Sequence, residues 1–296
     1  MNGFRHLHAT LGRLAEAQLF FIGGSMKSGT TWLQLLLDSH PAIACKGESH
    51  VANHLSRLLT ESLARHNQLL AHKNATIFRE LSGFPLYGGG DLAYLIAAAL
   101  LLGVAKGKDP GPARLAAIGE KTPDNIRHLD LLRTIFPHAR FIHLVRDGRD
   151  CAVSGWFHNQ RSSPDWIRGN FPSLSGYAAL FAREWAKDLA MAGAFAGRHP
   201  EACLTLRYED LVDDTPRQLA RVLDFLGVAA DQPTLDACCE AGAFARLSGG
   251  RAPGEEDRAS FFRKARPGDW RRHLDAAQEN EFRAAATPWL ERFGYA

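Results

Sequence analysis

The chain has 296 residues, a formal net charge of +3 and 46% apolar residues. This length is enough to bury a full core, and so small a net charge argues against a nucleic-acid partner. The five cysteines are scattered and form no C-x-x-C pair. Their pattern argues against a disulfide framework and a zinc cluster, and it favours a reducing, cytoplasmic location.

The first 18 residues mix charged and apolar side chains, so we expect an N-terminal extension rather than a secretory signal. The longest apolar run covers residues 92–105. A membrane-spanning helix needs roughly 20 apolar residues. We therefore expect no membrane span, and a buried or partly buried helix at this run. A helix that dips into a membrane beside a lipid acceptor is the alternative.

The stretch FFIGGSMKSGTTW at residues 20–32 predicts a buried strand, a loop of small residues and the start of a helix. The N–H groups of such a loop and the positive end of the helix together form an anion site. Nucleoside-triphosphate loops read G-x-x-x-x-G-K-[ST]. Here Thr30 occupies the lysine position and the lysine lies earlier, at Lys27. This departure indicates a nucleotide with a different reactive group; a tight turn that only makes the corner is the alternative.

Strands and helices are predicted to alternate along the rest of the chain. After the first strand at 19–22, apolar runs predict strands at 42–46, 115–119, 140–145 and 203–207. Helical patterns predict one helix that begins near residue 30 and another that begins near residue 149. They also predict helices at 50–72, 92–105, 125–136, 175–197, 215–226 and 275–292. Such alternation predicts a single α/β domain over 1–296, a P-loop-like three-layer fold with a central, mostly parallel β-sheet flanked by helices. Ligands of such sheets bind at the carboxyl ends of the strands.

Three segments are predicted to be irregular. Residues 158–172 are polar and contain proline, which is typical of a surface loop, and residues 248–262 are Gly-rich and charged, which favours a mobile loop. Glycines at 88–90 and the Pro110–Pro112 turn flank the apolar helix.

Two further groups of residues are suited to anions. Arg146 ends the strand at 140–145, and Ser154 follows two turns into the next helix. An arginine fork suits two phosphate oxygens and a hydroxyl can bind the third, although Arg146 could instead pair with Asp147 or Asp150. Arg263 and Lys264 lie beside the Gly-rich loop, where they could close over a phosphate. A solvated basic surface is the alternative for this pair.

Four blocks in order resemble the sulfotransferase family: SMKSGTTW, RDGRDCAVS, the Tyr208–Asp210 triplet and RKARPGDW. The resemblance runs from about residue 19 to the end of the chain. It implies the sulfate donor 3′-phosphoadenosine 5′-phosphosulfate (PAPS), with adenosine 3′,5′-bisphosphate (PAP) as product. It also implies roles by position: Lys27, Ser28, Gly29, Thr30 and Thr31 on the 5′-phosphosulfate, Trp32 and Tyr208 at the adenine, and Arg146, Ser154, Arg263 and Lys264 on the 3′-phosphate. The chain departs from the family's pattern at Met26, where many relatives have proline, and at Ala265, where a glycine is usual.

The acceptor hydroxyl needs a base, and Glu48 and His50 follow the second predicted strand. In relatives that resemble glycosaminoglycan and tyrosylprotein sulfotransferases, a glutamate in this region is the base. The cytosolic branch uses a histidine in a K-T-H pattern that is absent from Glu120–Pro123 here. We therefore expect Glu48 as the base, with His50 in reserve. The alternative for Glu48 is a salt bridge to Lys46 or Lys121. Lys121 is expected to neutralise the transferring sulfonate, oriented by Glu120.

The sequence therefore predicts a sulfotransferase that moves the sulfuryl group of PAPS to a hydroxyl, or less readily an amine, by in-line displacement without a metal. Lys27 is expected to assist departure of the nucleotide. A kinase-like phosphotransferase and a non-catalytic nucleotide-binding protein are the alternatives. The acceptor, whether small molecule, glycan, lipid or peptide, and the oligomeric state are left open.

Overall fold

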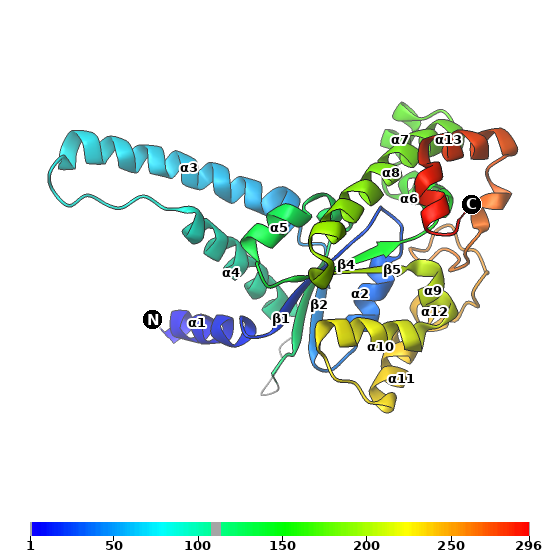
Figure 1. Cartoon of the computed structure of the whole chain (residues 1–296), viewed down its shortest axis with the longest axis horizontal. Helices are drawn as coiled ribbons and strands as arrows, with labels where there is room; N and C mark the ends of the chain where they lie inside the picture. Colours follow the sequence, from blue (N-terminus) through cyan, green and yellow to red (C-terminus); the bar gives the residue numbers. More distant parts are fainter. Residues whose placement is uncertain (1, 108–113, 296) are drawn as a thin grey trace.

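A computed structural model describes residues 2–107 and 114–295, and the predicted turn at Pro110–Pro112 lies outside them. Figure 1 shows a central sheet with helices on both faces. Its five strands are β1 (Gln18–Gly23), β2 (Ile43–Gly47), β3 (Ala117–Lys121), β4 (Arg140–Val145) and β5 (Cys203–Arg207). Their order is β2-β3-β1-β4-β5, and every pair is parallel. The predicted parallel α/β fold is confirmed.

Alternating side chains of the strands divide the core between the two faces of the sheet. Phe20 and Ile22 of β1 pack with α2 (Thr30–Asp38), α9 (Tyr208–Asp213), α10 (Thr215–Leu226) and α11 (Gln232–Ala241). Phe21 faces the other way, towards Phe141 of β4 and Phe195 of α8 (Leu174–Arg198). Because both faces are covered, the strands are almost wholly apolar.

A second cluster lies at the carboxyl end of β4. There α6 (Gly148–Ser162), α7 (Pro164–Asn170), α8 and α13 (Ala276–Arg292) pack around Trp185 and Phe282. The chain between α12 (Phe244–Ser248) and the short 3₁₀ turn at Asp269–Arg272 has no helix or strand. This irregular segment agrees with the loop predicted at 248–262; its mobility stays a prediction.

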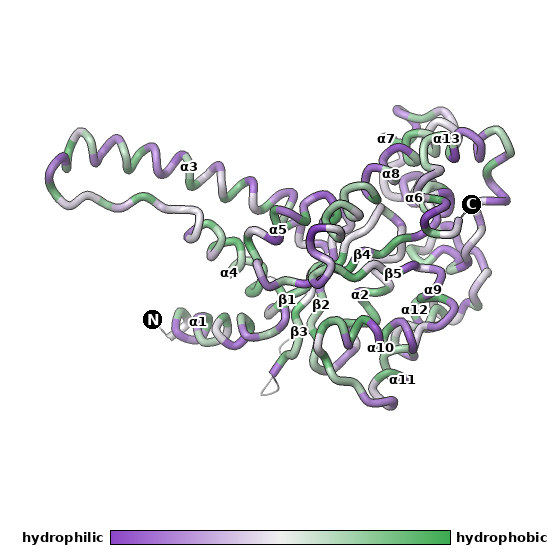
Figure 2. The backbone as a smooth tube through the Cα atoms, in the orientation of Figure 1, coloured by the Kyte–Doolittle hydropathy of each residue, from purple (hydrophilic) through white to green (hydrophobic). Residues whose placement is uncertain are grey.

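Two helices form an arm that projects from the body (Figure 1). A π-helical turn at Val51–Leu55 leads into α3 (Ser56–Lys73), and the chain returns through a second π-turn at Asn74–Phe78 to α4 (Gly89–Gly107). Figure 2 shows α4 as more hydrophobic than α3. One side of α4 packs through Ile96 and Leu100, while Tyr94 is exposed. None of the described helices is long and apolar enough to cross a membrane.

Several predicted boundaries are wrong. The strand predicted at 115–119 lies two residues later, because Glu120 and Lys121 are buried at its end. The loop predicted at 158–172 is mostly helical, since α6 continues to Ser162 and Pro164 begins α7. The helix predicted at 125–136 is divided into a 3₁₀ turn at Pro123–Arg127 and α5 (Leu129–Ile135). The N-terminal extension contains a helix, α1 (Asn2–Leu14).

Candidate active site

The loop between β1 and α2 has the backbone of an anion-binding turn. Gly29 precedes the first residue of α2 with φ 99°, and Lys27 is also left-handed with φ 69°. A Cβ at Gly29 would lie 2.5 Å from Cδ2 of Tyr208, so only glycine fits there. Thr30 and Thr31, the first two residues of α2, line the space beside Lys27, and the N–H groups of a helix start can bind an anion there.

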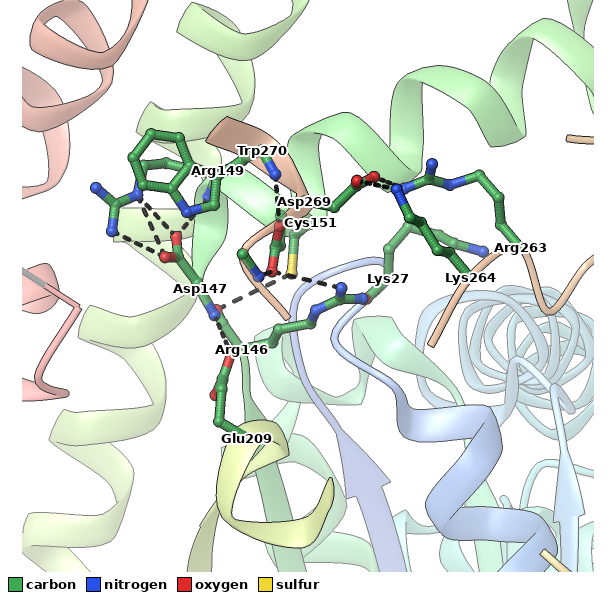
Figure 3. A network of polar contacts seen from close by, with 12 residues as sticks. Lys27, Arg146, Asp147, Arg149, Cys151, Glu209, Arg263, Lys264, Asp269 and Trp270 are labelled. Atoms are coloured by element: carbon green, nitrogen blue, oxygen red, sulfur yellow. Dashed lines mark hydrogen bonds and ion pairs between the residues drawn. The ribbon is translucent and has the colours of Figure 1, made fainter. Parts of the chain in front are cut away.

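That space is a cavity of about 580 Å³ at the carboxyl ends of the strands. Twelve of the fourteen predicted site residues line it: Lys27, Gly29, Thr30, Thr31, Trp32, Glu48, His50, Arg146, Ser154, Tyr208, Arg263 and Lys264. Figure 3 shows Lys27, Arg146, Arg263 and Lys264 brought together from three separate segments. Cavities of this volume suit ligands of nucleotide size.

Ser28 and Lys121 do not line this cavity. Ser28 is fully buried, its N–H donates to the Ser25 carbonyl over 3.1 Å, and its hydroxyl has no hydrogen-bond partner among the described residues. The direct phosphate contact predicted for Ser28 therefore has no counterpart in the cavity lining, and it stays a prediction. Lys121 is buried too, and it reaches the cavity wall only through its ion pair with Glu48.

Lys27 lies in a positive and poorly hydrated environment. Burial, and then the positive charges of Arg161 and Arg146, together lower the pKa of its ammonium to about 8. Nζ lies 4.5 Å from the centroid of the Phe261 ring. An anion placed here would relieve both the desolvation and the repulsion.

Arg146 is held in place by weak contacts. Its guanidinium donates to the Lys27 carbonyl over 3.2 Å and lies 4.5 Å from the Tyr208 ring centroid. An Asp150 carboxylate oxygen lies 3.6 Å from Nη2 of Arg146, and Nε is buried without a partner in the part of the chain that the structure describes. The carboxylate of Asp150 mainly accepts hydrogen bonds from the backbone of Gly268 and Trp270. The pairing with an aspartate that the sequence left as an alternative for Arg146 is thus present as a 3.6 Å ion pair, although Asp150 also binds two backbone N–H groups.

The neighbouring Arg149 is fully committed to the structure. It pairs with Asp147 and Glu279 at 2.8 Å each and stacks 4.0 Å from the Trp270 ring centroid. Figure 3 shows its guanidinium pointing away from Lys27 and Arg146. Of the two arginines in the RDGRD block, only Arg146 faces the cavity.

Asp269 holds the basic pair of the tail. It binds Arg263 over 2.6 Å and Lys264 over 2.5 Å. Burial would raise the pKa of Asp269, but the hydrogen bonds from Lys264 and Arg263 outweigh burial and lower it to about 2. Ala265, which follows the pair, is left-handed with φ 49°, so the position usually filled by glycine keeps the backbone that glycine prefers.

Glu48 and Lys121 form an ion pair of 2.5 Å. The Glu48 side chain is 47% exposed, and its other oxygen lies 3.9 Å from Nε2 of His50. The salt bridge to a lysine that was predicted as the alternative for Glu48 is therefore present. The same carboxylate also lines the cavity, as the predicted base would. Glu120 does not act on Lys121 as predicted, because its oxygens accept hydrogen bonds from Ser49, Thr122 and Asn125.

Trp32 and Tyr208 form an aromatic part of the cavity wall. The indole N–H of Trp32 donates to the Gly242 carbonyl over 2.8 Å, and its ring meets Tyr208 edge-on at 5.8 Å. Gly242, just after α11, and Phe244, the first residue of α12, also line the cavity. The sequence analysis missed both, because no motif in the sequence around them indicates ligand binding.

His158 is another cavity residue without a predicted role. Burial and the charges of Lys27 and Arg161 lower the pKa of His158 to about 4, so its imidazole is neutral at pH 7. His158 lies near the end of α6. It was given no role because the sequence analysis predicted a surface loop over residues 158–172.

The comparisons with known proteins bear directly on this geometry. A family model described as "Sulfotransferase family" matches residues 20–232. This chain belongs to the sulfotransferase family. It is 28% identical over 214 residues to the protein-tyrosine sulfotransferase of Drosophila melanogaster and 27% over 213 residues to protein-tyrosine sulfotransferase 1 of Danio rerio. Each match covers 72% of this chain but only 38% and 54% of these relatives, so the chain spans about half of their length or less.

Solved sulfotransferases share the fold. Mouse sulfotransferase SULT7A1, crystallised with PAP, superposes with a TM-score of 0.57 at 19% identity, over 95% of this chain and 88% of that one. Sulfotransferase STF9 from Mycobacterium avium superposes with a TM-score of 0.55 at 11% identity, over 99% and 81%. The predicted family and fold are thus confirmed for this member of the sulfotransferases.

Proposed function

We propose that this sulfotransferase moves the sulfuryl group of PAPS to a hydroxyl of an acceptor. The observation that carries the proposal is the single cavity in which Lys27, Arg146 and the Arg263–Lys264 pair meet. Three cationic segments around one space suit a ligand with phosphates at two ends. The family of the chain and the PAP named in the solved SULT7A1 structure support the same donor.

The residues present fit this donor. The N–H groups at the start of α2, with Thr30, Thr31 and Lys27, would hold the 5′ end. Trp32 and Tyr208 would lie against the adenine, and the unpartnered Nε of Arg146 is a donor for the 3′-phosphate, beside Ser154. Arg263 and Lys264 would reach the same phosphate by exchanging part of their contact with Asp269 for it.

The chemistry of the chain follows from these positions. When bound, PAPS supplies an electrophilic sulfur and a phosphate leaving group. Glu48 would accept the proton of the acceptor hydroxyl, because its carboxylate lies at the cavity and is held by Lys121. Lys27 would stabilise the negative charge that develops on the leaving phosphate, and Lys121 would offset charge on the transferring group. His50 is the reserve base.

The acceptor proposed for the first test is a peptide tyrosine. The curated relatives named above are protein-tyrosine sulfotransferases. A phenol would find aromatic contact at Phe261 and a neutral hydrogen-bond partner at His158, which both line the cavity. Glycan, lipid and small-molecule hydroxyls are the comparison substrates.

We also propose a cytoplasmic location, supported by the five free thiols and testable by cell fractionation.

The deciding experiment supplies labelled PAPS with a panel of tyrosine peptides, phenols, glycans and lipids and measures product mass. We expect an increase of one sulfonate on at least one hydroxyl acceptor, retained with chelator present and lost in Lys27→Ala. Transfer of phosphate from a magnesium nucleotide would instead support a kinase. PAP binding without transfer to any acceptor would indicate a non-catalytic nucleotide-binding protein.

A further inference from the structure

Glu120 is a buried carboxylate with three hydrogen bonds near the proposed base. It is 1% exposed and lies beside Lys121 at the end of β3. Oε1 accepts from the Ser49 backbone N–H over 2.9 Å and from the Thr122 hydroxyl over 2.6 Å. Oε2 accepts from the Asn125 amide over 2.8 Å. An ionised carboxylate, which only accepts, matches this set of donors.

Two consecutive residues of β3 therefore hold the segment that carries Glu48. The parallel register pairs Lys46 with Glu120 and Gly47 with Lys121. Neighbouring side chains of a strand leave on opposite faces. Glu120 thus binds the Ser49 backbone, whereas Lys121 binds the Glu48 carboxylate. Gly47 leaves room for this, because a Cβ there would lie only 3.0 Å from Cε of Lys121.

The segment needs such an anchor. Residues 48–50 are all exposed, and His50 is left-handed with φ 51°. An exposed segment without buried side chains samples many positions unless its backbone is bound. The Glu120–Ser49 hydrogen bond fixes the backbone one residue after Glu48, and the ion pair with Lys121 then fixes the carboxylate.

We propose that Glu120 is a positioning residue, which sets the place of Glu48 at the cavity through the Ser49 amide. This inference rests on the proposed function, in which Glu48 is the base. Glu120 itself contacts no reacting atom, since it is absent from the cavity wall and its oxygens bind Ser49, Thr122 and Asn125.

Two substitutions separate the anchor from the charge. Glu120→Asp keeps the charge but withdraws the carboxylate by about 1.5 Å, one carbon–carbon bond, and breaks the 2.9 Å hydrogen bond to Ser49. Glu120→Gln loses the charge but keeps an oxygen for Ser49. Its new NH₂ can face Asn125, whose Oδ1 has no partner within residues 2–107 and 114–295. Rotation of the Asn125 amide would let Oδ1 accept this NH₂, in exchange for the 3.2 Å bond to the Ile22 carbonyl.

We expect Glu120→Asp to lower kcat about 10- to 100-fold, with the Kd for PAP unchanged within about 2-fold. We expect Glu120→Gln to keep kcat within about 3-fold of the unmodified protein. Hydrogen exchange at the Ser49 amide should accelerate in Glu120→Asp and not in Glu120→Gln.

Asn125→Ala is the matched control, because it removes another donor to Glu120 and leaves the bond to Ser49. We expect it to lower Tm without changing kcat by more than about 3-fold or accelerating Ser49 exchange. The proposal is overturned if Glu120→Asp leaves kcat and exchange unchanged, if Glu120→Gln is as slow as Glu120→Asp, or if Asn125→Ala reproduces every effect. If the unmodified protein sulfates no acceptor, the proposed function fails, and Ser49 exchange still decides whether Glu120 is the anchor.

Discussion

The pKa of Lys27 connects burial of one side chain to anion binding. Burial, then Arg161 and Arg146, lower this pKa from 10.5 to about 8, so the ammonium loses its proton as pH rises through 8. The phosphates of PAP lose their last proton with a pKa of about 6, so their charge changes little between pH 7 and pH 9. We therefore expect the Kd for PAP to rise up to about 10-fold between pH 7 and pH 9.

Isothermal titration calorimetry at the two pH values measures this change. Lys27→Arg is the control, because arginine stays protonated throughout this range. Equal pH dependence in Lys27→Arg and in the unmodified protein would show that another group is responsible.

Glu48 makes a prediction about rate rather than binding. Its carboxylate binds Lys121 and lies beside the space left for the acceptor. We expect Glu48→Gln to reduce kcat about 10²- to 10⁴-fold, because the amide cannot accept the hydroxyl proton, while PAP binds normally. Steady-state kinetics with titration of PAP checks both values. His50→Ala is the comparison: a larger loss there than in Glu48→Gln would assign the base to His50.

At the scale of elements, the turn before α2 depends on one glycine conformation. An alanine at position 29 would be forced into φ 99°, which residues with a Cβ rarely adopt. Its Cβ would also lie 2.5 Å from Cδ2 of Tyr208. We expect Gly29→Ala to lower the free energy of unfolding by at least about 1 kcal/mol and to remove measurable PAP binding. Gly103→Ala is the control, since nothing lies within 4 Å of that site in α4, and alanine there should be neutral or stabilising. Denaturant titration and calorimetry compare the two variants, and normal PAP binding by Gly29→Ala would contradict the assigned turn.

The far half of α3 should be weakly protected against hydrogen exchange. Only Ser56 of the eighteen residues of α3 is buried, and Leu69 near its far end is half-exposed. A helix with so little tertiary packing opens easily. Hydrogen exchange should therefore be at least about 100-fold faster in the far half of α3 than in β1. Equal protection would mean that the arm is covered in solution.

Elements with local signals could be predicted from the sequence. The run at 19–22 and the loop after it gave β1, the turn and α2, because apolar runs and glycines act within a few residues. The end of β3 could not be predicted, because Glu120 and Lys121 belong to the strand through backbone pairing with β1 and β2, and their charges are bound by partners at 48–49. In the same way, the chain around Gly242 reaches Trp32 by tertiary packing alone.

At the scale of the whole molecule, the site depends on segments up to 237 residues apart, from Lys27 to Lys264. The topology explains this convergence. Lys27 follows β1 and Arg146 follows β4, and these strands are parallel neighbours whose carboxyl ends meet. Asp150 then holds the tail through the backbone of Gly268 and Trp270, which brings Arg263 and Lys264 to the same cavity. That residues 1–296 form one domain stays a prediction.

A crystal structure of the protein with PAP tests the central claim most directly. We expect the 5′-phosphate on the turn at 27–31 and the 3′-phosphate between Arg146, Ser154 and the Arg263–Lys264 pair, within one cavity. A nucleotide bound elsewhere, or a 3′-phosphate that touches neither Arg146 nor the tail, would contradict this account.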